Sequence, residues 1–173
     1  MDTLFRITHS SNFNTSVQAL MLIEQLATSK QLAVDRFYRT LYESLLDPRL
    51  ITSSKHALYL NLLFRALRVD INIKRVKAFV KRLLQIIHLH QPPFICGVLY
   101  LLKELESNMP GLRTMFTEPE DRDVDEEMFH DVIDVATDGI QEATPKPREV
   151  YDGKKRDPEY SFAEKSCNWE SVC

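Results

Sequence analysis

Hydrophobic residues return every three or four positions along the first two thirds of the chain, which is the spacing that buries one face of an α-helix. The pattern is clearest where Phe37, Leu41 and Leu45 recur at a constant interval. Helices are predicted to end near DP (47–48) and QPP (91–93), because proline disfavours the helical conformation of the residue before it. Five helices are expected before residue 108. The first covers about 15–29 and the second about 34–46. The third starts just after Ser54, the fourth contains 74–84 and ends before Gln91, and the fifth covers about 94–106.

The first, third and fifth expected helices start near residues 14, 54 and 93, which is a period of about 40 residues. Each period would hold two helices with a short connection, as in HEAT-type α-solenoids, whose stacked pairs bury one another's apolar faces. Internal sequence similarity is weak, so a compact helical bundle stays open as the alternative. We expect an all-α fold over residues 1–116, a HEAT-like α-solenoid of about two and a half helix pairs, followed by an acidic, largely disordered tail.

The fourth expected helix combines strong charge with strong apolarity in KRVKAFVKRLL (74–84). At about 100° per residue, apolar residues collect on one face and cations on the opposite face. The apolar face holds Val76, Phe79, Val80, Leu83 and Ile87, and the cationic face holds Lys74, Arg75, Lys77, Lys81 and Arg82. From residue 55 to residue 90 the only carboxylate is Asp70, whereas a solvated face usually interleaves acids with bases. The pattern predicts a helix with a buried apolar stripe and, on the opposite side, a cationic face that meets an anionic partner.

A row of cations on one rigid helix is suited to the phosphate backbone of a nucleic acid, because each neutralised phosphate releases counterions. Phe79 is expected in the core, so no exposed aromatic would stack on a base, and the contact should read shape and charge rather than sequence. Three alternatives stay open: a solvated face, an acidic partner protein, and masking by the chain's own tail. The candidate nucleic-acid-binding residues are Arg65, Arg68, Lys74, Arg75, Lys77, Lys81 and Arg82.

Charge is divided unevenly between the two parts of the chain. The net charge of −3 combines a balance of +7 over residues 1–116 with one of −10 over residues 117–173. The stretch TEPEDRDVDEE (117–127) is acidic and poor in apolar residues, so residues 117–150 are expected to be a linker with one possible short helix. Residues 151–173 mix aromatics with a basic cluster, and we predict a truncated docking segment there rather than a domain.

Composition and motifs argue against catalysis and against a membrane. Hydrophobic residues make up 44% and charged residues 27% of the 173 positions, as in ordinary globular proteins, and no apolar run reaches the about 18 residues of a membrane span. The chain lacks a glycine-rich phosphate loop and a nucleophile elbow. His88, His90 and Cys96 have no recognised metal-ligand spacing, and Cys96 is expected in the core. We therefore expect no enzyme, no metal and no cofactor, in a reduced intracellular compartment.

Four blocks of the sequence are distinctive: RFYRTLYESLLDPRL (36–50), RVKAFVKRLLQ (75–85), PPFICGVLYLL (92–102) and YDGKKRDPEYSFAEKSCNWE (151–170). Together they resemble the CCAAT-binding factor domain family. The stretch SNFNTSVQALMLIEQL (11–26) is similar to the helix that precedes these blocks in the family. The resemblance covers nearly the whole chain and is loose only across the acidic insert, which is also acidic and variable in the family.

The resemblance implies an α-helical, HEAT-like scaffold of the nucleus and nucleolus that takes part in assembly of the large ribosomal subunit. Its implied partners are precursor ribosomal RNA, the pre-ribosomal particle and a second nucleolar complex protein, while binding to CCAAT-box DNA is also attached to the family. The lack of a helix-turn-helix or zinc module argues mildly against specific DNA reading. The family's Tyr-Asp-Pro is Tyr151-Asp152-Gly153 here, and the chain stops soon after Trp169-Glu170, where the family continues with further helices. We therefore expect a fragment or a shortened form.

Overall fold

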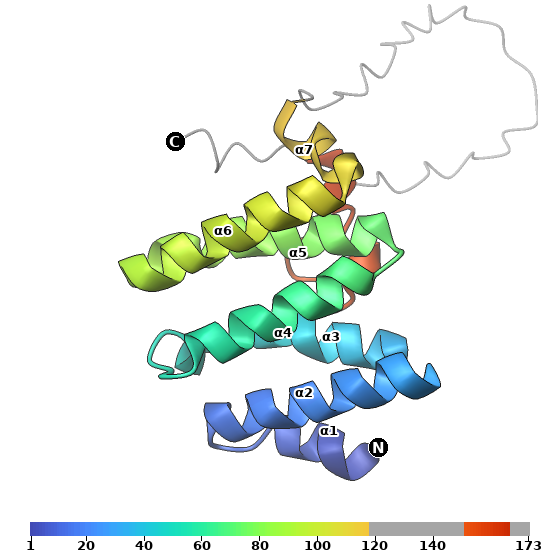
Figure 1. The fold of residues 1–173 in the computed structure, drawn as a ribbon, viewed down its shortest axis with the longest axis vertical. Coiled ribbons are helices and arrows are strands. Elements are labelled where there is room, and N and C mark those ends of the chain that lie inside the picture. The colour runs from blue at the N-terminus through green and yellow to red at the C-terminus, as the bar shows by residue number, and fades with distance from the viewer. Residues whose placement is uncertain (118–150, 167–173) are drawn as a thin grey trace, which may run out of the picture.

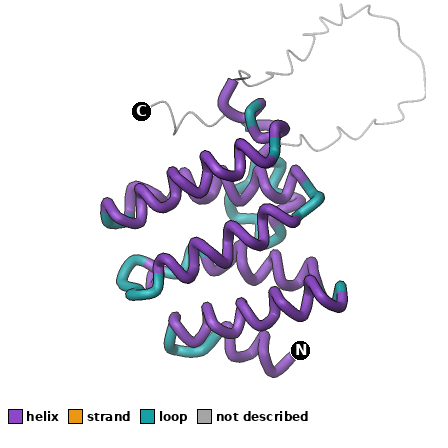
Figure 2. Tube along the Cα trace, in the orientation of Figure 1, coloured by secondary structure: helices purple, strands orange, loops and turns teal. Residues whose placement is uncertain are grey.

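The computed structural model describes residues 1–117 and 151–166, and all regular structure within these two ranges is helical (Figure 2). The α-helices are α1 (Asp2–Thr8), α2 (Phe13–Lys30), α3 (Val34–Ser44), α4 (His56–Val69), α5 (Ile73–Ile86), α6 (Pro92–Asn108) and α7 (Thr114–Thr117). Single turns of 3-10 helix are η1 (Pro48–Leu50), η2 (Ile87–Leu89), η3 (Pro110–Leu112), η4 (Pro158–Tyr160) and η5 (Ala163–Lys165).

Short polar residues and prolines determine where the helices begin. The Asn12 side chain accepts a hydrogen bond from the backbone N–H of Asn14, so α2 begins two residues earlier than the apolar spacing predicts. Asn72 caps α5 in the same way, since a side-chain oxygen at this position satisfies an otherwise unpaired N–H of the first turn. Pro92 opens α6, where a proline costs no backbone hydrogen bond.

The helices stack in two layers from the N-terminal end to α7 (Figure 1). In this view α2, α4 and α6 form the front layer, with α1, α3 and α5 behind them. Residues 151–166 return from the far end of the sequence and pack through η4 and η5 against α5 (Figure 1). The predicted all-α fold with stacked helix pairs is confirmed for the described residues.

The core lies between the two layers and is continuous from α1 to α6. Phe79 of α5 is fully buried, and its ring contacts the rings of Tyr38 and Tyr42 on α3 at centroid distances of 6.4 and 5.0 Å. In the front layer α6 approaches α4 closely at Gly97, where a Cβ atom would lie 2.6 Å from Leu60 Cδ1. Aromatic edges and one glycine therefore set the spacing of the helix pairs.

Two expectations from the sequence are wrong in detail. Helix α1 was not expected, because two turns are too short for apolar spacing to stand out, yet Phe5 is 2% exposed and anchors α1 on the core. Cys96 is exposed rather than in the core, because Phe94 and Val98 occupy the inner face of α6. The predicted acidic linker, except its first residue, and the end of the docking segment lie outside the described residues.

Candidate nucleic-acid interface on helix α5

The five cations of KRVKAFVKRLL (74–84), which lies within α5, do not form one exposed face. Arg75, Lys81 and Arg82 are only 7%, 2% and 2% exposed. The expectation that they lie on an exposed cationic face is therefore wrong for these three residues. Lys74 is exposed and Lys77 half-buried. The physical reason is that α3 and residues 151–166 pack over this side of α5 and give the buried cations partners of their own.

Arg75 is held by carboxylates. Its Nε and Nη2 donate to the two oxygens of Asp70 at 2.7 and 3.0 Å, and its Nη1 donates to Asp35 at 3.1 Å. The guanidinium also lies 4.2 Å from the centre of the Tyr38 ring. Burial lowers the pKa of Arg75, but its hydrogen bonds and charge interaction with Asp70, aided by Asp35, outweigh burial and raise the pKa above its ordinary value. Asp70, which looked like a lone acid in a basic stretch, is the counter-ion of Arg75.

Arg82 is held by neutral groups. Its Nη2 donates to the carbonyl oxygens of Gly153 and Lys155 at 2.7 and 3.1 Å, and its Nη1 donates to that of Tyr42 at 3.2 Å. The guanidinium stacks 3.3 Å from the centre of the Tyr42 ring. Burial lowers the pKa of Arg82 below the usual arginine value, yet no carboxylate among the described residues pairs with it. Arg82 therefore joins α3, α5 and residues 151–166 through backbone acceptors.

We name residues 151–166 the C-terminal segment. Within it, the N–H of Asp152 donates to the carbonyl of Ser161 at 3.0 Å, which closes the segment into a compact loop. Ser161 and Ala163 are fully buried, and Pro158 is buried as well. The segment is therefore attached to the helices by an apolar base.

Both buried and exposed polar contacts add to this attachment. The Tyr151 hydroxyl donates to Gln85 Oε1 at 2.9 Å, and its ring centre lies 5.7 Å from the Lys81 amine, within the range of a cation–π contact. Three ion pairs lie at the surface: Arg39 with Asp157 at 2.7 Å, Lys74 with Glu164 at 3.4 Å, and Arg156 with Glu43. Exposed pairs contribute about 0–1 kcal/mol each, so the buried contacts dominate.

Four of the seven predicted nucleic-acid-binding residues keep an accessible side chain. Arg68 is exposed, and 59% of the Lys74 side chain is exposed despite its pairing with Glu164. The half-buried Lys77 donates to the Thr114 hydroxyl at 3.0 Å. Arg65 is paired with Glu24 on α2, and 40% of its side chain is exposed. Nucleic-acid binding by Arg65, Arg68, Lys74 and Lys77 stays a prediction.

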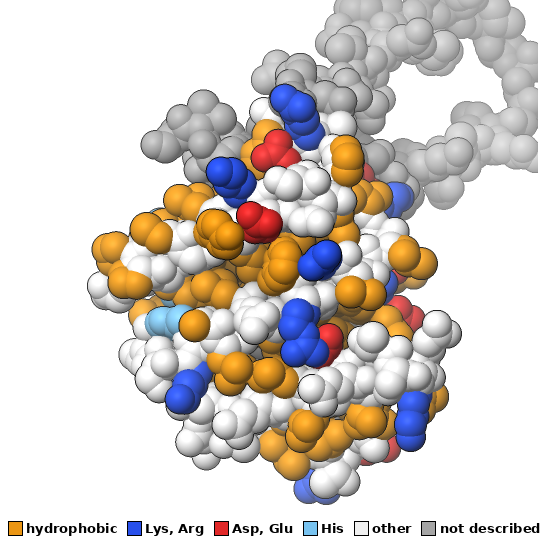
Figure 3. Space-filling view, in the orientation of Figure 1, with side chains coloured by type: hydrophobic (Ala, Val, Ile, Leu, Met, Phe, Trp, Pro, Cys, Tyr) orange, Lys and Arg blue, Asp and Glu red, His pale blue; other side chains and the backbone are white. Residues whose placement is uncertain are grey.

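Three of these four accessible candidates lie around the connection between α4 and α5. Arg68 lies at the end of α4, and Lys74 and Lys77 lie in the first turns of α5, across the three-residue connection between the two helices. On the face drawn in Figure 3, lysine and arginine side chains are scattered among apolar and polar ones and form no continuous ridge. We call Arg68, Lys74 and Lys77 the edge cations.

No metal centre is formed by the histidine, cysteine and acidic side chains of the described ranges. His88 and Cys96 are exposed, whereas His90 is buried with its Nδ1 3.0 Å from the carbonyl oxygen of Ile86 and its ring stacked on Phe94 at 4.2 Å. The helices of the described part are also too short or too polar to cross a lipid bilayer.

Reasoning from the sequence missed the segment residues that cover α5. Tyr151, Asp157 and Glu164 each contact a helix residue more than 60 positions away, and helical spacing carries no information on such contacts. The aromatic and basic mixture of YDGKKRDPEYSF (151–162) predicts a docking segment. Masking of the cations by the chain's own tail is one of the alternatives that the sequence leaves open, but the sequence does not give the residues in contact.

The sequence profile described as the CBF/Mak21 family matches residues 16–173 of the chain. Over 98% of its length, the chain is 65% identical to Ribosome biogenesis protein NOC1 of Chaetomium thermophilum. It is 52% identical over 78% of its length to CCAAT/enhancer-binding protein zeta of Homo sapiens, and 36% identical over 79% to Nucleolar complex protein 1 of Drosophila melanogaster. The matches span 17%, 13% and 13% of the respective relatives, so the chain corresponds to a small part of each.

Proposed function

This chain belongs to the CBF/Mak21 family, and we propose that it is part of a non-enzymatic scaffold in ribosome biogenesis. The proposed setting is the nucleolus, where the scaffold assists assembly of the large ribosomal subunit and binds precursor ribosomal RNA and other assembly factors. The observation that carries the proposal is the 65% identity, over 98% of the chain, to a protein named for ribosome biogenesis. A stack of helices with long exposed faces supports a scaffold role, because such stacks offer extended binding surfaces.

We place the RNA contact of this scaffold at the edge cations. Arg68 forms no ion pair with any described carboxylate, and Lys74 and Lys77 keep part of their side chains in solvent. Their positions at the adjoining ends of α4 and α5 allow them to follow one stretch of phosphate backbone. The buried Arg75, Lys81 and Arg82 are excluded from this contact because their partners lie within the chain.

The test replaces the edge cations together by glutamine (Arg68→Gln, Lys74→Gln, Lys77→Gln) in the full-length protein in cells. Ultraviolet crosslinking should recover less precursor ribosomal RNA, by about tenfold, because three phosphate contacts are lost. The control is Lys55→Gln, an exposed lysine just before α4, which should crosslink like the wild type. Unchanged crosslinking of the triple variant would contradict the RNA contact and favour a scaffold that binds proteins alone.

A second candidate function is binding to CCAAT-box DNA, which the name of the human relative, CCAAT/enhancer-binding protein zeta, favours. The three edge cations lie on two adjoining helix ends, an arrangement suited to backbone contact rather than to reading base edges in a groove. Purified chain binding a CCAAT duplex no more tightly than a scrambled duplex of equal length would exclude specific reading. Depletion of the protein without accumulation of large-subunit precursors would contradict the ribosome-assembly role itself.

A further inference from the structure

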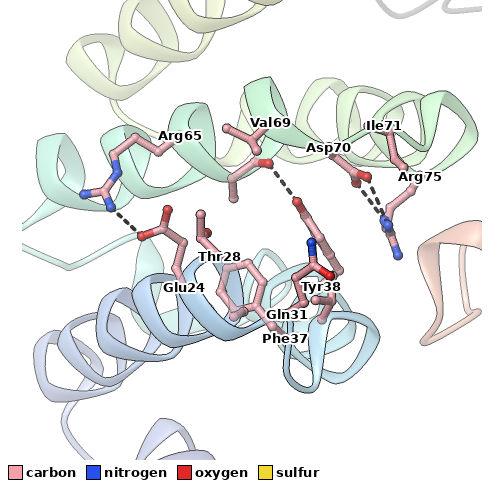
Figure 4. Close-up of a pocket in the computed structure, with 13 residues that line it drawn as sticks. Glu24, Thr28, Gln31, Phe37, Tyr38, Arg65, Val69, Asp70, Ile71 and Arg75 are labelled. Carbon is pink, nitrogen blue, oxygen red and sulfur yellow. Dashed lines mark hydrogen bonds and ion pairs between the residues drawn. The ribbon is translucent and has the colours of Figure 1, made fainter.

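A pocket of about 510 Å³ lies where α2 and α3 meet the end of α4 and the start of α5 (Figure 4). Its apolar wall includes Phe37, Ala66 and Val69, and the Tyr38 hydroxyl donates to the carbonyl of Ala66 at 2.8 Å across its floor. Pockets of this size with apolar walls and a few polar groups are typical binding sites. Volume and lining therefore allow a large apolar side chain to enter.

The mouth of the pocket is itself apolar. Ile71 is 98% exposed and Val69 is 66% exposed, and both line the pocket. Leu32, on the neighbouring connection from α2 to α3, is 50% exposed. Exposed apolar groups around a concave site indicate a surface that is covered by another molecule.

The connection that forms one lip is held in an unfavourable conformation. Gln31 and Ala33 have φ values of 50° and 54°, in the left-handed region that costs residues other than glycine roughly 1–2 kcal/mol each. Such backbone conformations persist only where the surrounding structure imposes them, and they are concentrated at binding sites. The backbone between α2 and α3, which forms this edge of the pocket, is therefore held in a conformation that its residues do not favour.

The charges that face solvent around the mouth are mainly positive. Glu24 and Asp70 lie inward, with side chains 9% and 1% exposed, whereas Arg65, the partner of Glu24, has 40% of its side chain exposed (Figure 4). Lys30 and Arg68, next to the lining residues, are exposed and form no ion pair with a described carboxylate. The exposed acid Asp35 is engaged with Arg75. A ligand with carboxylates beside its apolar group complements this distribution.

We infer that this pocket binds a segment of a partner protein in which an apolar side chain is flanked by acidic residues. The apolar side chain packs against Phe37, Val69 and Ile71, and the flanking carboxylates face Lys30, Arg65 and Arg68. An RNA ligand fits less well, because the aromatic rings of Phe37 and Tyr38 are buried and cannot stack on a base. This inference goes beyond the proposed RNA contact. It shares Arg68 with the edge cations but does not depend on Lys74 or Lys77.

The test measures fluorescence anisotropy of labelled peptides with the purified 173-residue chain. One peptide carries a central Leu-Phe flanked by Asp and Glu, a second replaces Leu-Phe by Ser-Ser, and a third replaces the acids by Lys. The first peptide should bind at least about tenfold more tightly than the other two. Two variants, Ile71→Ser and Thr28→Trp, should each weaken its binding by about tenfold, since one removes the apolar lip and the other fills the mouth.

Both altered positions are exposed, so the variants should keep the thermal midpoint of the wild type. The control Leu46→Ser removes an exposed leucine just beyond the opposite end of α3 and should not change binding. Absent binding, equal binding of the three peptides, or insensitivity to both pocket variants would overturn the inference.

Three further outcomes would assign the pocket to another occupant and overturn the inference as well. A gain in peptide affinity when Met128 and Phe129 are both replaced by Ser would assign it to the chain's own acidic stretch. Self-association that is lost in Ile71→Ser would assign it to a second copy. Weaker binding of single-stranded RNA by Ile71→Ser would assign it to RNA, whereas failure of the edge-cation test alone would leave this inference standing.

Discussion

Arg82 is a charged side chain whose hydrogen-bond acceptors are neutral. Three carbonyl oxygens and one tyrosine ring surround its guanidinium, and they belong to two parts of the chain, α3 and the C-terminal segment. A planar cation with several donors can bridge separate backbone segments in a way that a lysine amine cannot. At this position the charge serves cohesion of the fold.

Replacing Arg82 by Met should lower the free energy of unfolding by about 2–4 kcal/mol, because charge-assisted hydrogen bonds are lost and buried carbonyls are left unpaired. Urea denaturation monitored by circular dichroism measures this. The matched control is Lys103→Met on α6, an exposed lysine, for which a change within about 0.5 kcal/mol is expected. Equal effects of the two substitutions would refute the internal role of Arg82.

Tyr42 makes stability sensitive to alkaline pH. Burial raises its pKa to about 12 from an ordinary value of 10.0. Between these values Tyr42 has lost its phenolic proton in the unfolded chain and keeps it in the folded chain, so the contribution of Tyr42 to stability falls as pH rises above 10, by at most about 1.4 kcal/mol per pH unit. Tyr42→Phe should reduce that slope in denaturation between pH 9 and about 11.

The control for this slope is Tyr100→Phe, since Tyr100 is 67% exposed. Its loss of stability with pH should match that of the wild type. A wild-type slope that is unaffected by Tyr42→Phe would mean that the phenol of Tyr42 is accessible in the folded chain.

At the scale of elements, the C-terminal segment behaves as a packed part of the helix stack. It closes on itself through Asp152 and Ser161 and places Ala163 fully buried against the body. Its ion pairs lie at the periphery, where their contribution is small. The segment should therefore remain attached at high salt, because apolar burial is not screened.

Placing a carboxylate at the base of the segment should release it. Ala163→Asp would bury a charge without a partner, so amide hydrogen exchange at Asp152 should accelerate by at least about tenfold. The control Tyr160→Asp alters an exposed residue of the same segment and should leave that exchange rate close to the wild-type value. Slow exchange in Ala163→Asp would show that the segment does not depend on this contact.

The helices themselves could be predicted from sequence, and the surroundings of α5 could not. The spacing of Phe37, Leu41 and Leu45 predicted the buried face of α3, because that information is local. The partners of Arg82 are more than 35 residues away on either side, and a helical projection shows only which cations share a face. It cannot show whether another part of the chain covers that face.

At the scale of the whole molecule, the two-layer stack separates an internal set of cations from an external one. Arg75, Lys81 and Arg82 make contacts that connect α3, α5 and the C-terminal segment. Arg68, Lys74 and Lys77 lie around the connection between α4 and α5 and keep part of their side chains in solvent. The pocket at the junction of α2 to α5 adds a second surface with a different chemistry. The proposed RNA contact and the proposed protein site adjoin at Arg68, which takes part in both proposals.

The division between internal and external cations is tested most directly by lysine labelling. The purified chain is labelled with acetic anhydride, with and without single-stranded RNA, and the labelling is quantified by mass spectrometry. Lys81 should react about tenfold more slowly than Lys103 in both conditions, because its amine is buried. RNA should slow labelling of Lys74 and Lys77 and leave Lys55 unchanged. Fast labelling of Lys81 in free protein, together with its protection by RNA, would contradict the account, because the helix face would then be open to RNA.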